Sequence, residues 1–186
     1  MRNADCGRLR PEGSGGQGLR LPSASFGEQT MRHPERKIES KETMIALLER
    51  SAVGRMATVN RKGFPVIKPV NYVYWKGKVY LHSSTRGEKI RDLRRGSPVC
   101  FEVDEPVAYV TAMGPTCRST YYFRSIIVKG TGAIVNQPAK KLKVIEKLME
   151  KYQPEGGYGG VAEEVLRKTA VVEISIREMT GKERLG

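Results

Sequence analysis

The chain has 186 residues, of which 39% are hydrophobic, and a formal net charge of +13 at pH 7. A chain of this length suits one domain with a substantial core. Its charge favours anionic partners in general, such as nucleic acid, anionic lipid or phosphorylated small molecules, and says nothing about the fold. No apolar run approaches the roughly 18 residues of a membrane span, so the sequence predicts a soluble protein without a membrane partner.

The three cysteines, Cys6, Cys100 and Cys117, are odd in number and form no C-x-x-C pair. This usage argues against a disulfide framework or a structural zinc site. It is typical of a reducing, cytoplasmic compartment. Cys100 lies in the segment PVCFEV, where we expect it to be a small buried side chain.

Residues 1–30 differ in composition from the rest of the chain. They are rich in Gly, Ser, Pro and Arg and lack hydrophobic periodicity, which predicts a disordered N-terminal extension before a single domain over residues 31–186. The extension contains Gly13-x-Gly15-x-x-Gly18, formally a dinucleotide-binding motif. No predicted strand precedes this motif and no predicted helix follows it, so we reject the match.

The first predicted elements are a helix and three strands. Ser40 is expected to cap a helix that runs to about Arg50, with Gly54 as its stop signal. The strands that follow are GRMATV (54–59), PVIKPVNYVYW (65–75) and KVYLHSS (78–84). A tight turn around Lys76 and Gly77 joins the last two, so this part of the chain is predicted to be a meander of hairpins.

The second half of the chain adds further helices and strands. A capping-box pattern at Thr85 and Glu88 predicts a short helix that begins near Arg86. The strands PVCFEVD and AYVTAM and a long β-rich run come next. Asn136 is expected to cap an amphipathic helix that begins near Pro138. A short helix and the strand TAVVEISI complete the predicted elements.

These six or so strands lie mostly in sequential hairpins, with short helices between them. This order predicts a mainly β fold of the α+β kind, built as a small closed or nearly closed barrel. Gly130 and Gly132, in the long β-rich run, are the expected sites of a bulge or bend.

The segment KVYLHSSTRGEKIRDLRR, residues 78–95, combines hydroxyls and cations where a strand passes into a helix. The hydroxyls of Ser83 and Ser84, the Lys89 ammonium and the backbone N–H groups of the helix start would satisfy a phosphate monoester. A helix cap alone needs one hydroxyl. The residues therefore leave an anion site and a simple cap both open.

Two further features lie upstream of this segment. Arg55 and Thr58 lie on opposite faces of one predicted strand, and Pro69 cannot donate to a ladder in the next. The backbone of Val70 and Asn71 beside this proline is a candidate partner for a planar heterocycle. Each of these residues also fits an ordinary solvated or strand-pairing position.

Motifs of hydrolytic chemistry are absent from the sequence. It contains no H-E-x-x-H, no G-x-S-x-G and no carboxylate pair at catalytic spacing, and only two histidines, His33 and His82. A basic chain without an acid–base set is typical of a protein whose bound cofactor supplies the chemistry.

Three segments carry a family resemblance: GRMATVNRKGFPVIKPVNYVYWKGKVYLHSSTRGEKIRDLRRGSPVCFEVDE, YYFRSIIVKGTGAIV and TAVVEISIREMTGKE. Over residues 31–186 the chain resembles the FMN-binding split-barrel family related to pyridoxamine 5'-phosphate oxidase, in particular its 5-nitroimidazole-resistance branch. The resemblance implies a six-stranded split barrel with Greek-key character and short flanking helices. It also implies a homodimer that holds FMN in each of two clefts between the subunits.

The resemblance also implies a set of cofactor-binding residues. They are Arg55, Met56, Ala57, Thr58, Val70, Asn71, His82, Ser83, Ser84, Lys89, Tyr122, Arg124, Ser125 and Lys182. In this assignment RMAT lies near the ribityl and phosphate end, and the backbone of residues 70 and 71 faces the ring. The phosphate side is lined by His82, Ser83, Ser84 and Lys89. The residues that approach from the partner subunit are Tyr122, Arg124 and Ser125.

The implied function is that of a reductase in which FMN takes a hydride from NAD(P)H and passes electrons to a small acceptor such as a nitro-aromatic or a quinone. His82 is a candidate catalytic residue that meets the substrate. The chain finishes Arg184-Leu185-Gly186 instead of Arg-Leu-x-Pro, which argues against pyridoxamine phosphate as the substrate.

Two alternatives to this reductase remain. One is a non-catalytic flavin- or haem-binding protein of the same fold, with His82 as the axial ligand of a haem. The other is a basic nucleic-acid-binding module, which only the net charge favours.

Overall fold

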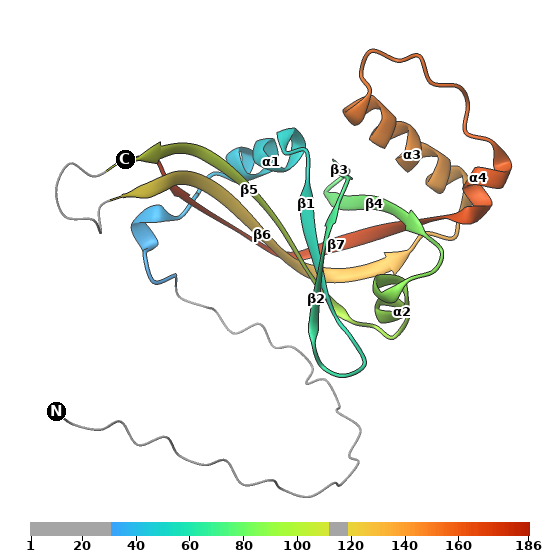
Figure 1. Ribbon diagram of the computed structural model, residues 1–186, viewed down its shortest axis with the longest axis horizontal. Coiled ribbons are helices and arrows are strands. Elements are labelled where there is room, and N and C mark those ends of the chain that lie inside the picture. Colours follow the sequence, from blue (N-terminus) through green and yellow to red (C-terminus); the bar gives the residue numbers. More distant parts are fainter. Residues whose placement is uncertain (1–30, 112–118) are drawn as a thin grey trace, which may run out of the picture.

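The computed structural model describes residues 31–111 and 119–186, so the predicted N-terminal extension lies outside the described residues. The described chain forms one antiparallel sheet of seven strands in the order β2-β1-β5-β6-β7-β4-β3, with short helices around it (Figure 1). The strands are β1 (Gly54–Val59), β2 (Pro65–Val70), β3 (Tyr72–Trp75), β4 (Lys78–Ser84), β5 (Pro98–Val110), β6 (Thr120–Ile134) and β7 (Thr169–Arg184). The helices are the 3-10 turn η1 (Pro34–Arg36), α1 (Lys41–Arg50), α2 (Glu88–Arg94), α3 (Pro138–Tyr152) and α4 (Glu163–Lys168).

The predicted mainly β fold is confirmed, with two changes in how the strands are divided. The predicted strand 65–75 is interrupted at Asn71 and forms β2 and β3, because each half pairs with a different neighbour. The predicted strand PVCFEVD and the start of AYVTAM, residues 108–110, form one long strand, β5, which pairs with β6 along most of its length. Residues 112 and 113 of AYVTAM lie outside the described residues. One division and one fusion leave the number of strands unchanged, so the sheet has seven strands, one more than the six-stranded barrel that the family resemblance implies.

The connection through Asn71 determines the shape of the sheet. β2 is one edge of the strand order and β3 is the other, yet a single residue joins them. The sheet must curl until its two edges meet at this residue, and no ladder joins β2 to β3 within the described residues. The result is a split barrel.

Helix α1 closes one side of this barrel. Ser40 caps the helix by accepting a hydrogen bond from the Thr43 N–H at 3.1 Å, which confirms the prediction. Leu47 and Leu48 of α1 are fully buried in the main core. The predicted stop at Gly54 is wrong, since the cap residue is Ser51 and Gly54 begins β1.

A glycine at position 54 has a packing reason. A Cβ there would lie 2.1 Å from the Phe101 ring, which fills the centre of the main core. Phe101 takes the inward position on β5, so its neighbour Cys100 points outward and is exposed. The prediction that Cys100 is buried is therefore wrong: along β5 the side chains alternate between the two faces, and Phe101, the next residue, takes the buried position.

Helix α3 packs on the outer side of the sheet and forms a second, smaller core. Val144 and Leu148 of α3 are buried there together with Val73 of β3 and Val171 of β7. The predicted cap at Asn136 is wrong. The cap position is occupied by residue 137 without a side-chain bond, and Pro138 starts the helix, where its missing N–H needs no partner.

The turns of the sheet follow the predicted glycines. Lys76 and Gly77 both have positive φ, 49° and 74°, as a two-residue hairpin turn requires. At Gly130 the β6–β7 register shifts, which confirms the predicted bulge, and a Cβ there would lie 2.1 Å from the Ser175 carbonyl oxygen. Within residues 31–111 and 119–186, no helix is long and apolar enough to cross a membrane.

Candidate functional site

Helix α2 begins two residues later than the sequence predicts. Its cap position is Gly87, with φ of 129°, and no side chain caps it, so the predicted capping box at Thr85 is wrong. The positive φ of Gly87 separates the preceding turn from the helix. In that turn the Ser84 hydroxyl accepts a hydrogen bond from the Arg86 N–H at 3.2 Å.

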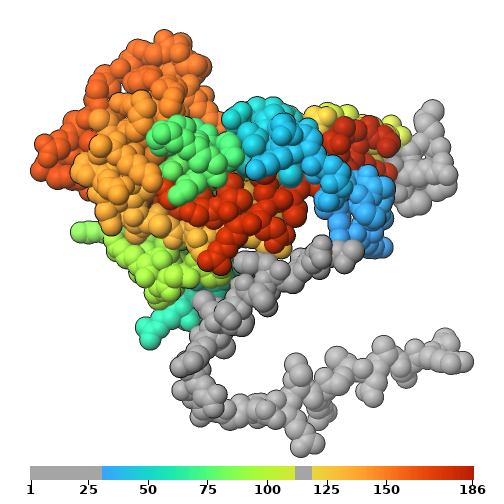
Figure 2. Space-filling model, turned by 180° about the vertical axis from the view of Figure 1, so that it is seen from behind, coloured from blue at the N-terminus to red at the C-terminus, as the bar shows by residue number. Residues whose placement is uncertain are grey.

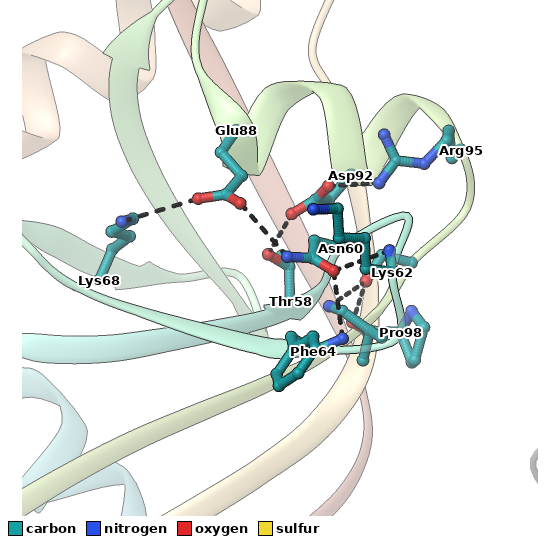
Figure 3. Close-up of polar contacts among 11 residues, drawn as sticks. Thr58, Asn60, Lys62, Phe64, Lys68, Glu88, Asp92, Arg95 and Pro98 are labelled. Atoms are coloured by element: carbon teal, nitrogen blue, oxygen red, sulfur yellow. Dashed lines mark hydrogen bonds and ion pairs between the residues drawn. The ribbon is translucent and has the colours of Figure 1, made fainter. Parts of the chain in front are cut away.

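Buried polar contacts fix α2 against β1 (Figure 3). The Thr58 hydroxyl donates to Asp92 at 2.9 Å, and both side chains are almost completely buried. The other Asp92 oxygen accepts from Arg95, and the Asn60 amide donates to Glu88 at 3.5 Å. Thr58, predicted to bind the cofactor, therefore anchors the helix that carries the next part of the site.

Three basic side chains from three elements form a cluster beside α2: Lys68 of β2, His82 of β4 and Lys89 of α2. Burial and the nearby Lys68 lower the pKa of Lys89, and burial and the nearby Lys89 lower the pKa of His82. Both effects are those expected where like charges gather in a partly desolvated place. A bound anion would relieve them.

Glu88 forms an ion pair with one member of this cluster, since its carboxylate lies 3.9 Å from the Lys68 ammonium (Figure 3). Lys68 was missed by the sequence reasoning. The signal that finds it is the β1–β2 register, which places Lys68 opposite Met56, a core residue, and so on the inward side of an edge strand. Ser83 and Ser84 end β4 beside the cluster, in the stretch predicted for the phosphate.

The segment RMAT divides between the two faces of β1. Met56 is only 1% exposed and belongs to the main core, and Thr58 lies on the same inner face of the strand. Arg55 lies on the outer face, where Glu102 accepts from its guanidinium at 3.0 Å and Asp104 forms a second ion pair. Hydrogen bonds that the guanidinium donates to Asp104 and Glu102 raise the pKa of Arg55. Its charge is therefore compensated within the chain.

The predicted partner-side residues also divide between faces, because neighbouring residues of a strand point in opposite directions. Arg124 lies on the face of α1, where its guanidinium is 3.1 Å from Glu183 and 3.5 Å from Glu105. Tyr122, two positions away, shares that face. Ser125 lies on the opposite face, in register with Lys182. One chain therefore presents the four residues on two surfaces.

Val70 and Asn71 lie where β2 passes into β3. Val70 is buried and pairs with Gly54, whereas Asn71 is exposed and lies outside both ladders. The next residue, Tyr72, is held by the Tyr152 hydroxyl, which accepts from the Tyr72 N–H at 2.9 Å. The backbone contact to a heterocycle is predicted for Val70 and Asn71, and of these two residues only Asn71 lies outside the ladders.

The outer face of the sheet near Arg55 carries exposed aliphatic side chains. Ile67 of β2 is 62% exposed and Ile127 of β6 is 41% exposed, and the strand registers place both on the Arg55 face. Cys100 is exposed on the same face. Large aliphatic side chains on an uncovered sheet face are typical of an interaction surface.

The described residues contain no group of three or more His, Cys, Asp or Glu side chains placed to hold a metal ion. The site consists instead of a basic cluster at the split of the barrel, an exposed backbone segment at Asn71 and an adjoining outer sheet face.

A split β-barrel with a basic cluster at its opening defines the class of this protein. The chain belongs to the pyridoxamine 5'-phosphate oxidase family, whose model matches residues 40–183. The comparison with curated protein sequences found no match.

Several solved structures share the fold. A protein from Bacteroides thetaiotaomicron described as a 5-nitroimidazole antibiotic resistance protein superposes with a TM-score of 0.70 at 22% identity, over 79% of this chain and 86% of that one. The FAD and haem binding protein from Mycobacterium smegmatis gives 0.74 at 21% identity, over 81% and 74%. The flavocytochrome Anf3 from Azotobacter vinelandii gives 0.76 at 21% identity, over 84% and 73%.

Proposed function

We propose that this chain binds FMN and holds its phosphate at the cluster of Lys68, His82 and Lys89. The observation that carries the proposal is the gathering of three basic side chains from three elements in a partly buried place, where burial and Lys68 lower the pKa of Lys89, and burial and Lys89 lower the pKa of His82. A phosphate dianion would supply the missing charge and accept hydrogen bonds from both ammonium groups. The nearby hydroxyls of Ser83 and Ser84 would complete the contact.

The descriptions of similar structures support a flavin as the ligand. Proteins with this fold are described as FAD-binding, as FAD- and haem-binding and as a flavocytochrome. We propose FMN because one phosphate matches one cluster. The outward backbone of Asn71 would contact the ring, while Thr58 would act indirectly by keeping α2 and Lys89 in place.

The proposed activity is an NAD(P)H-dependent reduction of a small acceptor such as a nitro-aromatic or a quinone, in the cytoplasm. Bound FMN would supply the hydride chemistry. The residues of this chain would bind and orient it, and His82 would hold or release a proton near the substrate. In the flavin-free chain the lowered pKa of His82 favours the neutral imidazole, and a neutral ring can both donate and accept a hydrogen bond.

We further propose that the functional unit is a homodimer. Ile67 and Ile127 are exposed on the Arg55 face, and contact with the same aliphatic surface of a second copy of the chain would bury them. A partner would also bring residues from its own β6 toward the cofactor, as the family resemblance implies.

A second candidate keeps the fold and replaces the activity: a carrier of flavin or haem with His82 as an axial ligand. The observation that favours it is the exposed position of His82 at the split of the barrel. The two candidates differ in the absorption spectrum of the purified protein, since a flavin and a haem have different bands. A flavin spectrum that bleaches on anaerobic mixing with NADPH or NADH supports the reductase. A haem spectrum, or a flavin that neither nicotinamide bleaches, would contradict it.

A further inference from the structure

Lysines one turn apart on α3 are held in different ways. Lys147 pairs with Glu150 of the same helix. Lys151 is held by a carbonyl and an aromatic ring: its Nζ donates to the Ser51 carbonyl at 2.8 Å and lies 3.9 Å from the centre of the Tyr72 ring. The Lys151 amine is therefore removed from water on one side without an acid paired to it among the described residues.

A cavity of about 290 Å³ opens beside this amine. Figure 2 shows the surroundings: the green surface of β3 lies between the orange surface of α3 and the blue surface of α1. The lining residues are Glu49, Val73, Tyr74, Lys147, Glu150 and Lys151. Because Lys151 lines this cavity, a small molecule that enters it lies beside the Lys151 side chain.

Burial favours the neutral form of this amine. Desolvation lowers the pKa of Lys151 to about 8, and the more distant charge of Glu49 offsets only part of that effect. The Tyr72 ring attracts the charged form and so acts in the same direction as Glu49. A far larger fraction of Lys151 than of an exposed lysine is consequently an uncharged, nucleophilic amine near neutral pH.

We propose that Lys151 is a site of acylation by small acyl phosphates, which reach its amine through this cavity. The neutral Nζ attacks the carbonyl carbon of the donor and forms a C–N bond. The C–O bond to phosphate breaks, and phosphate leaves with the electron pair. The nitrogen loses one proton to solvent. The size of the cavity favours donors with a short acyl chain over bulky carrier-bound ones.

Acylation of Lys151 would affect the segment that connects β2 to β3. The amide product carries no charge and loses the attraction of the Tyr72 ring. Tyr152, adjacent to Lys151, bonds the backbone N–H of Tyr72 and the Ala52 carbonyl, so the end of α3 is the support of this corner. Asn71, the residue proposed to face the flavin ring, immediately precedes Tyr72. Only this last link rests on the proposed function; the acylation itself does not.

The test compares Lys151 with Lys147 in the full-length protein. The protein is treated with limiting acetyl phosphate between pH 7 and 9.5, then denatured and labelled with isotopic acetic anhydride, and each site is quantified by mass spectrometry. We expect Lys151 to react about ten times faster than Lys147 at pH 7.5, with a rate that reaches half its maximum near pH 8. In urea the two lysines should react equally.

Two results would overturn the proposal. Native Lys151 that reacts no faster than Lys147 would mean that its amine is closed off and only ties α3 to α1. A preference for Lys151 that persists in urea would assign the reactivity to local sequence instead of the folded surroundings of its amine. Lys151→Arg serves as the control, since it keeps the charge and should remove the fast-labelling peptide without lowering the melting temperature. These readouts are independent of flavin binding.

Discussion

Thr58 and Asp92 form a buried hydrogen bond of 2.9 Å that joins the centre of β1 to the middle of α2. The bond determines where α2 sits, and α2 carries Lys89. A threonine in the family-like segment RMAT thus contributes to the candidate site through the position of a helix.

Replacing Thr58 by valine removes the hydroxyl while keeping the shape of the side chain. Asp92 then lacks one partner in a buried place, so we expect a loss of about 1–3 kcal/mol in the free energy of unfolding. Urea denaturation measures this value. The control is Thr131→Val on the exposed side of β6, which should change stability by no more than about 0.5 kcal/mol. Equal effects of the two substitutions would show that the Thr58–Asp92 bond does not anchor α2.

Glu173 predicts an acid-dependent loss of stability. Burial raises the pKa of Glu173, but hydrogen bonds from Lys140, Lys78 and Tyr80 outweigh burial and lower the pKa to about 2. The folded pKa is below the ordinary value of 4.5, so this contribution is fully present above about pH 4.5 and is lost as the pH falls toward 2.

The measurement for Glu173 is the melting temperature between pH 7 and pH 2. Glu173→Gln should be less stable than the wild type at pH 7 and should show a smaller loss on acidification. Glu163→Gln, at a carboxylate that is 85% exposed, is the matched control and should follow the wild-type curve. Parallel curves for the wild type and Glu173→Gln would contradict the assignment.

The outer sheet face predicts a subunit interface. Ile67→Asp places a charge on the exposed aliphatic surface, and burying it without a partner should weaken a dimer by about 3 kcal/mol, roughly 100-fold in Kd. Light scattering after size-exclusion chromatography should give a dimer for the wild type and a monomer for the variant. Val165→Asp on α4, at a residue that is 52% exposed, should leave the dimer intact. A wild-type protein that is monomeric while it retains flavin would refute the shared interface.

The depressed pKa of Lys89 predicts opposite effects on stability and binding. The folded state disfavours the charged form of Lys89, because burial and Lys68 both act against it. Lys89→Gln should therefore leave the melting temperature of the flavin-free protein unchanged or slightly higher, while FMN affinity falls. A lower melting temperature in the absence of flavin would show that Lys89 is a structural residue.

The sequence predicts the framework of this protein better than its polar details. The Ser40 cap, the turn at Lys76 and Gly77 and the bulge at Gly130 follow from local chemistry, and all three are confirmed. The caps predicted at Thr85 and Asn136 are wrong because backbone geometry determines where both helices begin. A positive φ at Gly87 precedes the first helix, and Pro138 is the first residue of the second.

The pairing of strands distant in sequence explains why the sequence alone did not identify Lys68 as a residue of the candidate site. Arg55 and Lys68 are both basic strand residues, and nothing local distinguishes them. The fold pairs Arg55 with two carboxylates on β5. It places Lys68 beside Lys89, and the ion pair of Lys68 with Glu88 is long, at 3.9 Å. Strand neighbours distant in sequence decide which of the two cations is available to an anion.

The central claim is that Lys68 and Lys89 bind the phosphate of FMN. Isothermal titration with FMN and with riboflavin, which has the same ring and no phosphate, tests it most directly. Lys89→Ala and Lys68→Ala should each lose a charge-assisted contact worth about 1.5–3 kcal/mol, roughly 10- to 150-fold in the Kd for FMN, and almost nothing for riboflavin. Lys62→Ala, in the exposed β1–β2 turn, should bind both ligands as the wild type does. Equal losses for FMN and riboflavin at position 89, or no loss for either, would place the phosphate elsewhere and contradict the account.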